Sequence, residues 1–156
     1  MAKKPIVMER SSNKLDPIAI QEVQKQLGVQ FPNLLLECIK NNNGGRPART
    51  DFILQHGKKK ESGLAAFLSF DLKDKDVNIV AYYEDPPEYF PEGLIAFGST
   101  GGSSMICFDY RNGKDNLNPP IVYWDSGIEE NQGISYLADN FDDFMDMLYE
   151  PEDKYW

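Results

Sequence analysis

The sequence predicts a single α+β domain built around a central, mainly antiparallel sheet. Three features favour this class: two segments with helical spacing open the chain, unbroken apolar runs occur at 105–108 and 121–125, and an amphipathic segment closes the chain. The chain has 156 residues, of which 41% are hydrophobic, and this is enough material for one buried core. We therefore expect one domain over residues 1–156, with flexibility confined to 1–14 and 150–156.

An N-terminal pair of helices is expected first. Asp16 is a suitable N-cap with Pro17 at the first helical position, and Gly28 supplies a stop signal after Leu27. The second helix is expected to bury Leu34, Leu35, Cys38 and Ile39. It ends at residues 41–45, where asparagine or glycine can adopt the left-handed cap conformation.

The middle of the chain is expected to be rich in strands. Segments 52–55 and 64–70 are predicted as strands, separated by a polar loop at 56–63 that we expect to be mobile and exposed. Segment 74–83 fits a helix or an alternating strand, and we favour the helix. Segment 85–93 cannot be regular because its three prolines fix φ and remove donors. Segment 94–97 then enters the sheet.

A glycine-punctuated turn, with Gly98, Gly101 and Gly102, leads into the apolar run 105–108, where burial on both faces is expected. The Asn112-Gly113 turn signal lies between this strand and the next one, at 121–125. After the polar segment 126–133, a closing helix is expected with one apolar face, capped by Asp139 or Asn140. That face consists of Phe141, Phe144, Met145 and Leu148. The carboxylates of Asp142, Asp143 and Asp146 fall outside this stripe.

The net charge of −9 is unevenly distributed. Residues 1–60 contain eleven Lys/Arg and five Asp/Glu, whereas residues 61–156 contain five and twenty. Such an acidic field repels nucleic acid and attracts basic proteins, and it raises association rates more than it fixes affinity. The alternative is that these carboxylates form a solvated face that only aids solubility.

The sequence shows none of the residue patterns that a catalytic site or a metal site requires. The single histidine, His56, lies in a polar loop, and the two cysteines lie among apolar neighbours as expected for reduced, buried thiols. Segment 71–76 lacks the turn glycine and closing glutamate of a calcium loop, and no GK[ST] follows the glycine turn. We expect no enzyme, no metal and no cofactor. A signal peptide and a membrane-spanning segment are also missing, so a cytoplasmic protein is expected.

Six short segments, taken in order, resemble the SUKH superfamily of cell-wall assembly regulators and bacterial immunity proteins. They are Leu27-Gly28 with Phe31-Pro32; Asn43-Gly44-Gly45; Ile95-Ala96-Phe97-Gly98 with Thr100-Gly101-Gly102; Cys107-Phe108-Asp109-Tyr110; Val122-Tyr123-Trp124-Asp125; and 137–144. The chain departs from the family pattern at Ser103-Ser104, where a glycine and an acidic or amide residue are usual. These serines can still hydrogen-bond the backbone of the turn.

The resemblance implies a bacterial cytosolic immunity protein, monomeric when free, that blocks a cognate toxin, often a nuclease. We expect one acidic face, drawn from 82–92 and 125–153, which can compete for the basic cleft in which a nuclease holds phosphates. The partner-binding residues we predict are Tyr82, Tyr83, Glu84, Asp85, Glu88, Tyr89, Asp125, Glu129 and Glu130. The family-motif residues, mostly structural, are Gly44, Gly45, Gly98, Gly101, Gly102, Asp109, Trp124, Phe141 and Phe144.

Three alternatives stay open at this stage. Tyr89-Phe90 either anchors a partner or forms a lid over the core. Trp124 is expected to be buried with its indole N–H paired, the alternative being an exposed anchor. The runner-up function is a non-catalytic ligand- or peptide-binding adaptor that uses the sheet and the Gly98–Gly102 turn as a concave pocket.

Overall fold

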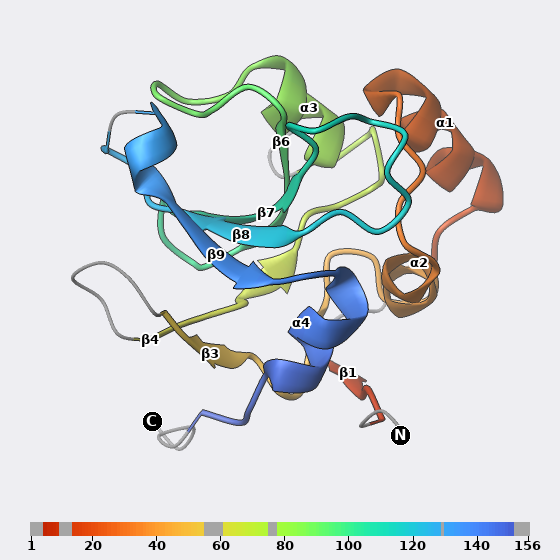
Figure 1. The fold of residues 1–156 in the computed structure, drawn as a ribbon. Helices are drawn as coiled ribbons and strands as arrows, with labels where there is room; N and C mark the ends of the chain where they lie inside the picture. Colours follow the sequence, from red (N-terminus) through yellow and green to blue (C-terminus); the bar gives the residue numbers. More distant parts are fainter. Residues whose placement is uncertain (1–4, 10–13, 55–60, 75–77, 129, 152–156) are drawn as a thin grey trace.

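The computed structural model describes residues 5–9, 14–54, 61–74, 78–128 and 130–151 (Figure 1). It is an α+β fold with a C-terminal helix, as predicted. The helices are α1 (Pro17–Leu27), α2 (Asn33–Lys40), α3 (Ile79–Glu84), the 3-10 helix η1 (Glu130–Gly133) and α4 (Phe141–Met147). The strands are β1 (Met8–Glu9), β2 (Arg46–Pro47), β3 (Asp51–Ile53), β4 (Glu61–Gly63), β5 (Ala66–Phe67), β6 (Leu94–Ser99), β7 (Met105–Asp109), β8 (Ile121–Trp124) and β9 (Ile134–Ala138).

The caps of α1 are those predicted from the sequence. The side chain of Asp16 accepts a hydrogen bond from the backbone N–H of Ile18 at 2.9 Å, and Gly28 ends the helix with φ of 72°. The second helix, α2, also lies where it was predicted. Its C-cap, Asn41, has φ of −109°, so the left-handed conformation expected in this turn occurs instead at Gly44, with φ of 76°.

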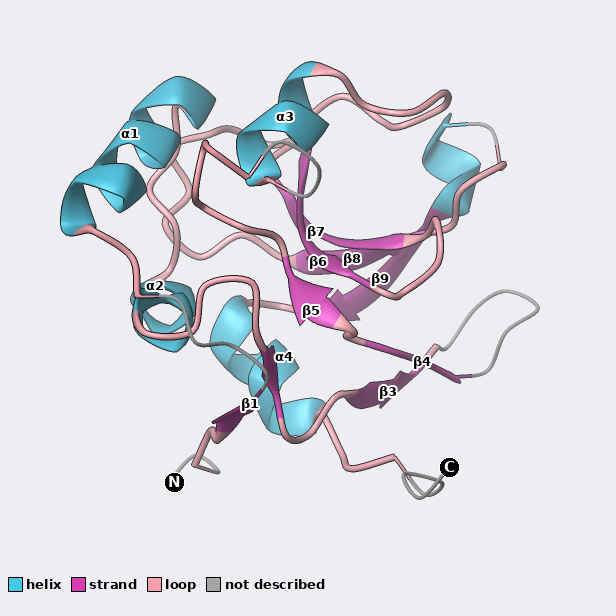
Figure 2. Ribbon diagram, turned by 180° about the vertical axis from the view of Figure 1, so that it is seen from behind, coloured by secondary structure: helices cyan, strands magenta, loops and turns pink. Residues whose placement is uncertain are grey.

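The central sheet is antiparallel throughout and has the order β5-β6-β7-β8-β9. Its two faces are both covered, as the unbroken apolar run of β7 predicts. Figures 1 and 2 show α3 on one side of the sheet and α4 on the other. On the α4 side, Phe108 contacts the rings of Phe97 and Phe141. Met105 lies opposite Trp124 in the ladder, and the ring of Trp124 contacts Phe90 on the α3 side.

The expected strand over 64–70 is reduced to β5. The reason is a change of partner along this segment: the Leu64 N–H donates to Thr50, next to β3, whereas the Ala65 N–H donates to Ser99 in β6. Glu61–Gly63, which we expected in a mobile loop, forms β4 and pairs with β3. His56 and the rest of that loop lie outside the described residues.

Segment 74–83 contains the helix that we favoured over a strand, but the helix begins only at Ile79. Asn78 caps it, because its Oδ1 accepts from the Ala81 N–H at 2.7 Å. Residues 85–93 form no helix or strand, as their prolines predict. The closing helix is capped by Asn140, one of the two predicted caps, and its four apolar side chains are all buried.

Besides β4, three further strands were missed by sequence reasoning. In β9 the register shifts opposite Ile121 and Val122, so apolar and polar side chains do not alternate regularly along it. The other two are β1 and β2, which have two residues each. Met8 and Glu9 therefore pair with Arg46-Pro47, within an N-terminal segment for which we expected flexibility.

Candidate partner-binding surface

The two segments predicted to bind a partner, 82–89 and 125–130, meet at one end of the sheet. Phe90 contacts Trp124, the last residue of β8, with ring centroids 5.0 Å apart. Trp124 pairs with Ile134, which directly follows η1. The loop after α3 and the connection from β8 to β9 therefore lie at the same end, as both ribbon views show (Figures 1 and 2).

The loop after α3 presents carboxylates to solvent. We call residues 84–92 the acidic loop. Its four acidic side chains are exposed, and none forms an ion pair within the described part of the chain: Glu84, Asp85, Glu88 and Glu92. The loop contains no lysine or arginine. It therefore offers uncompensated negative charge to a partner.

Two consecutive aromatic residues of the acidic loop, Tyr89 and Phe90, have different environments. Phe90 is half-buried and makes edge-to-face contacts with Tyr82 and Trp124, so it covers the core. Tyr89 is 39% exposed and has φ of 69°, in the left-handed region that non-glycine residues seldom adopt. The lid interpretation thus holds for Phe90, whereas Tyr89 is available to a partner.

The two tyrosines of α3 face different surroundings. Tyr83 accepts a hydrogen bond from Lys114 Nζ at 2.8 Å, and the same ammonium donates to the Leu27 carbonyl at the end of α1. Lys114 Nζ also lies 5.0 Å from the centroid of the Tyr83 ring. Tyr83 therefore joins α3 to α1. Tyr82 instead packs on Phe90, and burial, with a smaller effect from Cys107, raises the pKa of its hydroxyl.

Asp125 lies where the glycine turn meets the β8–β9 connection. Its carboxylate accepts from the Ser104 hydroxyl at 3.4 Å, and Ser104 Oγ also accepts from the Ser126 N–H at 3.4 Å. The Ser103 and Ser126 hydroxyls hydrogen-bond each other. The serine pair that departs from the family pattern thus connects the turn to the neighbouring loop. Of the two glutamates predicted beside Asp125, Glu129 lies outside the described residues and Glu130 begins η1.

A cavity of about 410 Å³ lies between α3 and the strands β6 and β7. The acidic loop contributes Asp85 to its lining, and Ser99 contributes from the strand end beside the glycine turn. The cavity is lined by Leu68, Asn78, Ala81, Tyr82, Asp85, Ser99 and Met105. Two residues predicted to bind a partner, Tyr82 and Asp85, are thus brought together on its wall. Sequence spacing gave no signal for the cavity, because its lining comes from four separate segments.

The acidic residues of α4 do not lie at the end of the sheet that carries the acidic loop. We expected one acidic face drawn from 82–92 and 125–153, and the structure divides it. Asp142 lines a groove with Glu37 and Cys38 of α2. Figure 2 shows α4 on the side of the sheet away from α3. The division arises because β9 carries the chain from one end of the sheet to the other before α4 begins.

Most family-motif residues are structural. Gly101 has φ of 87°, which favours glycine, and a Cβ at Gly98 would lie 2.6 Å from Leu64 Cδ1, so a larger residue there would displace this buried side chain. Gly102 faces no such restriction. Gly44 and Gly45 form the turn after α2, and the Gly45 carbonyl accepts from the Phe67 N–H of β5. Phe141 and Phe144 are fully buried.

Asp109 closes the start of the β7–β8 loop through Arg111. The guanidinium donates from Nε to Oδ1 at 2.9 Å and from NH2 to Oδ2 at 2.8 Å. Partial burial acts to raise the pKa of Asp109, but the hydrogen bonds and charge of Arg111 outweigh it and hold the pKa below its ordinary value. Asp109 is thus engaged within the chain.

Trp124 is buried, as predicted, and its side chain is 0% exposed. The expected partner of its indole N–H is not found: Nε1 has no hydrogen-bond acceptor among the described residues. The ring of Phe90 packs against the indole instead.

Both cysteines are buried and free, and desolvation raises the pKa of Cys38 to about 12, which makes it an unreactive thiol.

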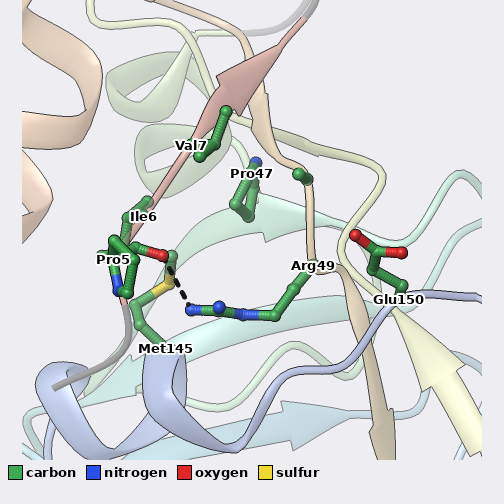
Figure 3. A pocket seen from close by; sticks show the side chains of 8 residues that line it. Pro5, Ile6, Val7, Pro47, Arg49, Met145 and Glu150 are labelled. Carbon is green, nitrogen blue, oxygen red and sulfur yellow. Dashed lines mark hydrogen bonds between the residues drawn. The ribbon is translucent and has the colours of Figure 1, made fainter.

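A second cavity, of about 160 Å³, lies near β1, β2 and α4 (Figure 3). Its only cationic group, Arg49, donates from its guanidinium to the Pro5 carbonyl at 3.1 Å. Met145 of α4 and Glu150 line the same cavity. It lies far from the acidic loop, and its arginine ties the N-terminal segment to the body of the protein.

The parts of the chain that the structure describes contain no group of three His, Cys, Asp or Glu side chains arranged to hold a metal ion. Within the same ranges, every helix is too short or too polar to cross a membrane.

The N-terminal helix pair, the central antiparallel sheet and the C-terminal helix agree with the fold that the resemblance to the SUKH superfamily implied. The model of the SMI1 / KNR4 family (SUKH-1) matches residues 14–147, and the chain belongs to that family. A comparison with curated protein sequences finds no match.

Proposed function

We propose that this protein is a bacterial immunity protein that binds and blocks a cognate toxin through the acidic loop and the adjoining β8–β9 connection. The observation that carries the proposal is the acidic loop itself: four exposed carboxylates without ion pairs in the described chain, beside an exposed tyrosine. Membership of the SUKH-1 family is consistent with this role. The free protein acts as a cytoplasmic monomer without cofactor, nucleic acid or catalysis.

The partner is a basic protein, and a nuclease fits best. A nuclease holds phosphates with lysine and arginine, so its cleft attracts carboxylates and excludes other cations. The acidic loop can occupy that cleft and deny it to substrate without any chemical step. Opposite charges also accelerate encounter, which suits a protein that must capture a toxin before it acts.

Tyr89 supplies the apolar contact that charge alone does not. Tyrosines at the centre of an interface, surrounded by charged residues, are typical hot spots. Tyr89 has this environment, because Glu88 precedes it and Glu92 follows within the same loop. Its backbone is anchored by Phe90 against the core, so little ordering is needed on binding.

The test is calorimetry with the toxin domain encoded next to this gene, combined with rescue of poisoned cells. The double variant Asp85→Lys/Glu88→Lys reverses the acidic loop. The matched control, Glu22→Lys/Asp115→Lys, makes the same change in net charge at exposed positions elsewhere. We expect about a hundredfold loss of affinity for the first variant and about a threefold loss or less for the control. No complex at low salt, together with no rescue, would defeat the proposal.

The cavity favours a second candidate, a non-catalytic adaptor that binds a ligand or peptide beside the Gly98–Gly102 turn. Ser99, within that turn, and Met105, which follows it, both line the cavity. A bulky residue at Gly101 would then abolish binding in a folded protein. Reversing the charge of Glu88 and Glu92, which belong to the acidic loop but do not line the cavity, would leave both the affinity and its salt dependence unchanged.

A further inference from the structure

We propose that the cavity between α3 and the strands β6 and β7 receives an arginine side chain of the partner, with Asp85 as its counterion. This inference rests on the proposed function, because it specifies how the basic partner is recognised. Three properties of the lining support it: an apolar wall, a single carboxylate and a tyrosine.

The wall suits the aliphatic part of an arginine. Leu68 and Met105 are buried at 6% and 5% exposure, and Ala81 adds a methyl group from α3. Long basic side chains bury their methylene stems on such surfaces and keep the charged end near water. The volume of about 410 Å³ leaves room for one such side chain.

Asp85 determines the charge of the occupant. It is the only acidic residue of the lining, which contains no lysine or arginine. Its side chain is exposed and makes no hydrogen bond or ion pair within the described residues. An anionic ligand would be repelled, and an apolar one would cover the carboxylate without pairing it, which is costly. A cation removes both penalties.

Tyr82 and Ser99 favour a guanidinium over an ammonium group. A guanidinium stacks on aromatic faces and donates several hydrogen bonds in one plane, whereas an ammonium is a compact, strongly hydrated charge. Tyr82 lines the cavity, and burial raises the pKa of its hydroxyl above the ordinary value, at which it is already neutral near pH 7. Ser99 Oγ, which already accepts from the Gly101 N–H at 3.1 Å, lies on the same lining as a further polar group.

The experiment titrates the full chain with n-butylguanidinium, a mimic of the arginine side chain, and follows methyl groups by NMR at low ionic strength. The reporters are Ala81, Met105 and Leu68, with Ile53 of β3 as the remote reference. The matched probe is n-butylurea, which has nearly the same shape without charge. We expect saturable shifts of the cavity methyl groups with a Kd on the order of millimolar, and at least about tenfold weaker binding of n-butylurea.

Two variants separate the cavity from the general acidic field. Asp85→Asn removes the counterion and is expected to weaken n-butylguanidinium binding about tenfold. Glu88→Gln makes the same charge change outside the lining and is expected to change it by about twofold or less. Equal effects of the two variants, equal binding of n-butylurea or n-butylammonium, or shifts that miss the cavity methyl groups would each overturn the inference.

The arginine site and the immunity role can be contradicted by different results. If the toxin binds the wild-type protein and Asp85→Asn behaves like Glu88→Gln in that complex, the cavity inference is wrong and the immunity role stands. If n-butylguanidinium occupies the cavity but the toxin forms no complex, the cavity is cation-selective and the immunity role is wrong.

Discussion

Phe90 packs edge-to-face on the fully buried Trp124, with ring centroids 5.0 Å apart and planes inclined by 83°. This contact joins two segments that lie more than thirty residues apart in the sequence. It fixes the acidic loop against the end of β8 and sets where Tyr89 is presented. The candidate binding surface therefore depends on one aromatic pair in the core.

We predict that Phe90→Ala uncovers Trp124 and loosens the acidic loop. Loss of a half-buried phenylalanine should lower the free energy of unfolding by about 2 kcal/mol. In a Trp156→Phe background, the fluorescence of Trp124 should shift to longer wavelength because water reaches the indole. Phe90→Leu is the control and should retain most of the stability. An unchanged emission spectrum in Phe90→Ala would contradict the proposed cover.

Gly98 and Gly102 should respond differently to alanine. A Cβ at Gly98 would meet Leu64 Cδ1 at 2.6 Å, whereas one at Gly102 would meet only Thr100 Oγ1 at 4.0 Å. We expect Gly98→Ala to lower the free energy of unfolding by about 1–3 kcal/mol and Gly102→Ala to change it by about 0.5 kcal/mol or less. Urea denaturation of both variants measures this difference. Equal losses would mean that the turn itself, and not the contact with Leu64, requires glycine.

Tyr89 should show a conflict between stability and binding. Its φ of 69° is disfavoured for a residue with a Cβ, and asparagine tolerates this conformation better. Tyr89→Asn should therefore be as stable as wild type, or more stable by up to about 1 kcal/mol. Its affinity for the toxin should fall at least about tenfold, because the aromatic contact is lost.

Thermal denaturation and calorimetry on the same Tyr89→Asn sample test both expectations. Tyr136→Asn is the matched control, because Tyr136 is another exposed tyrosine, located on β9 away from the acidic loop. A Tyr89→Asn variant that is less stable and binds normally would show that Tyr89 serves the fold.

The Asp109–Arg111 pair should make stability depend on pH at the acid end. Because the folded pKa of Asp109 lies below its ordinary value of about 3.9, the pair stabilises the protein above that pH. The contribution is lost as the pH falls through the folded pKa. Arg111 is 39% exposed, so solvent screens the pair, and Arg111→Gln should cost about 1 kcal/mol at pH near 7.

Urea denaturation of Arg111→Gln and wild type at pH near 7 and near 2 gives the comparison. The two proteins should differ at the higher pH and approach each other at the lower one, because protonation of Asp109 removes its attraction to Arg111. Lys73→Gln, which removes an exposed charge without an ion pair in the described chain, is the control and should show no such convergence. A constant difference at both pH values would contradict the ion-pair explanation.

Local signals in the sequence predicted the helix ends well. Asp16, Pro17 and Gly28 predicted both ends of α1, and the pair Asp139 or Asn140 predicted the start of α4 to within one residue, because caps depend on hydrogen bonds within a few residues. The apolar runs of β7 and β8 predicted strands buried on both faces. The bulged strand β9 was missed because its register shift disturbs the alternation on which strand prediction depends.

The candidate site was predicted only in part. The sequence marked Tyr82, Tyr83 and the acidic loop as one aromatic and acidic segment, but spacing alone does not show that Lys114 draws Tyr83 toward α1. Spacing also gives no indication that the acids of α4 belong to another side. Both depend on which surface of the sheet each helix covers, and that is settled by packing between distant segments.

By itself, the sequence determined the α+β class, both caps of α1, the buried strands β7 and β8 and the excess of negative charge after residue 60, because each of these depends on composition or on neighbours along the chain. Only the tertiary structure decided that the acidic loop and Asp125 lie at the same end of the sheet and that Asp85 and Tyr82 line one cavity with Ser99 and Met105. It also decided that the carboxylates of α4 lie on another side of the molecule. The physical reason is that strand pairing and the Phe90–Trp124 contact bring together residues whose separation in sequence carries no information about their distance in space.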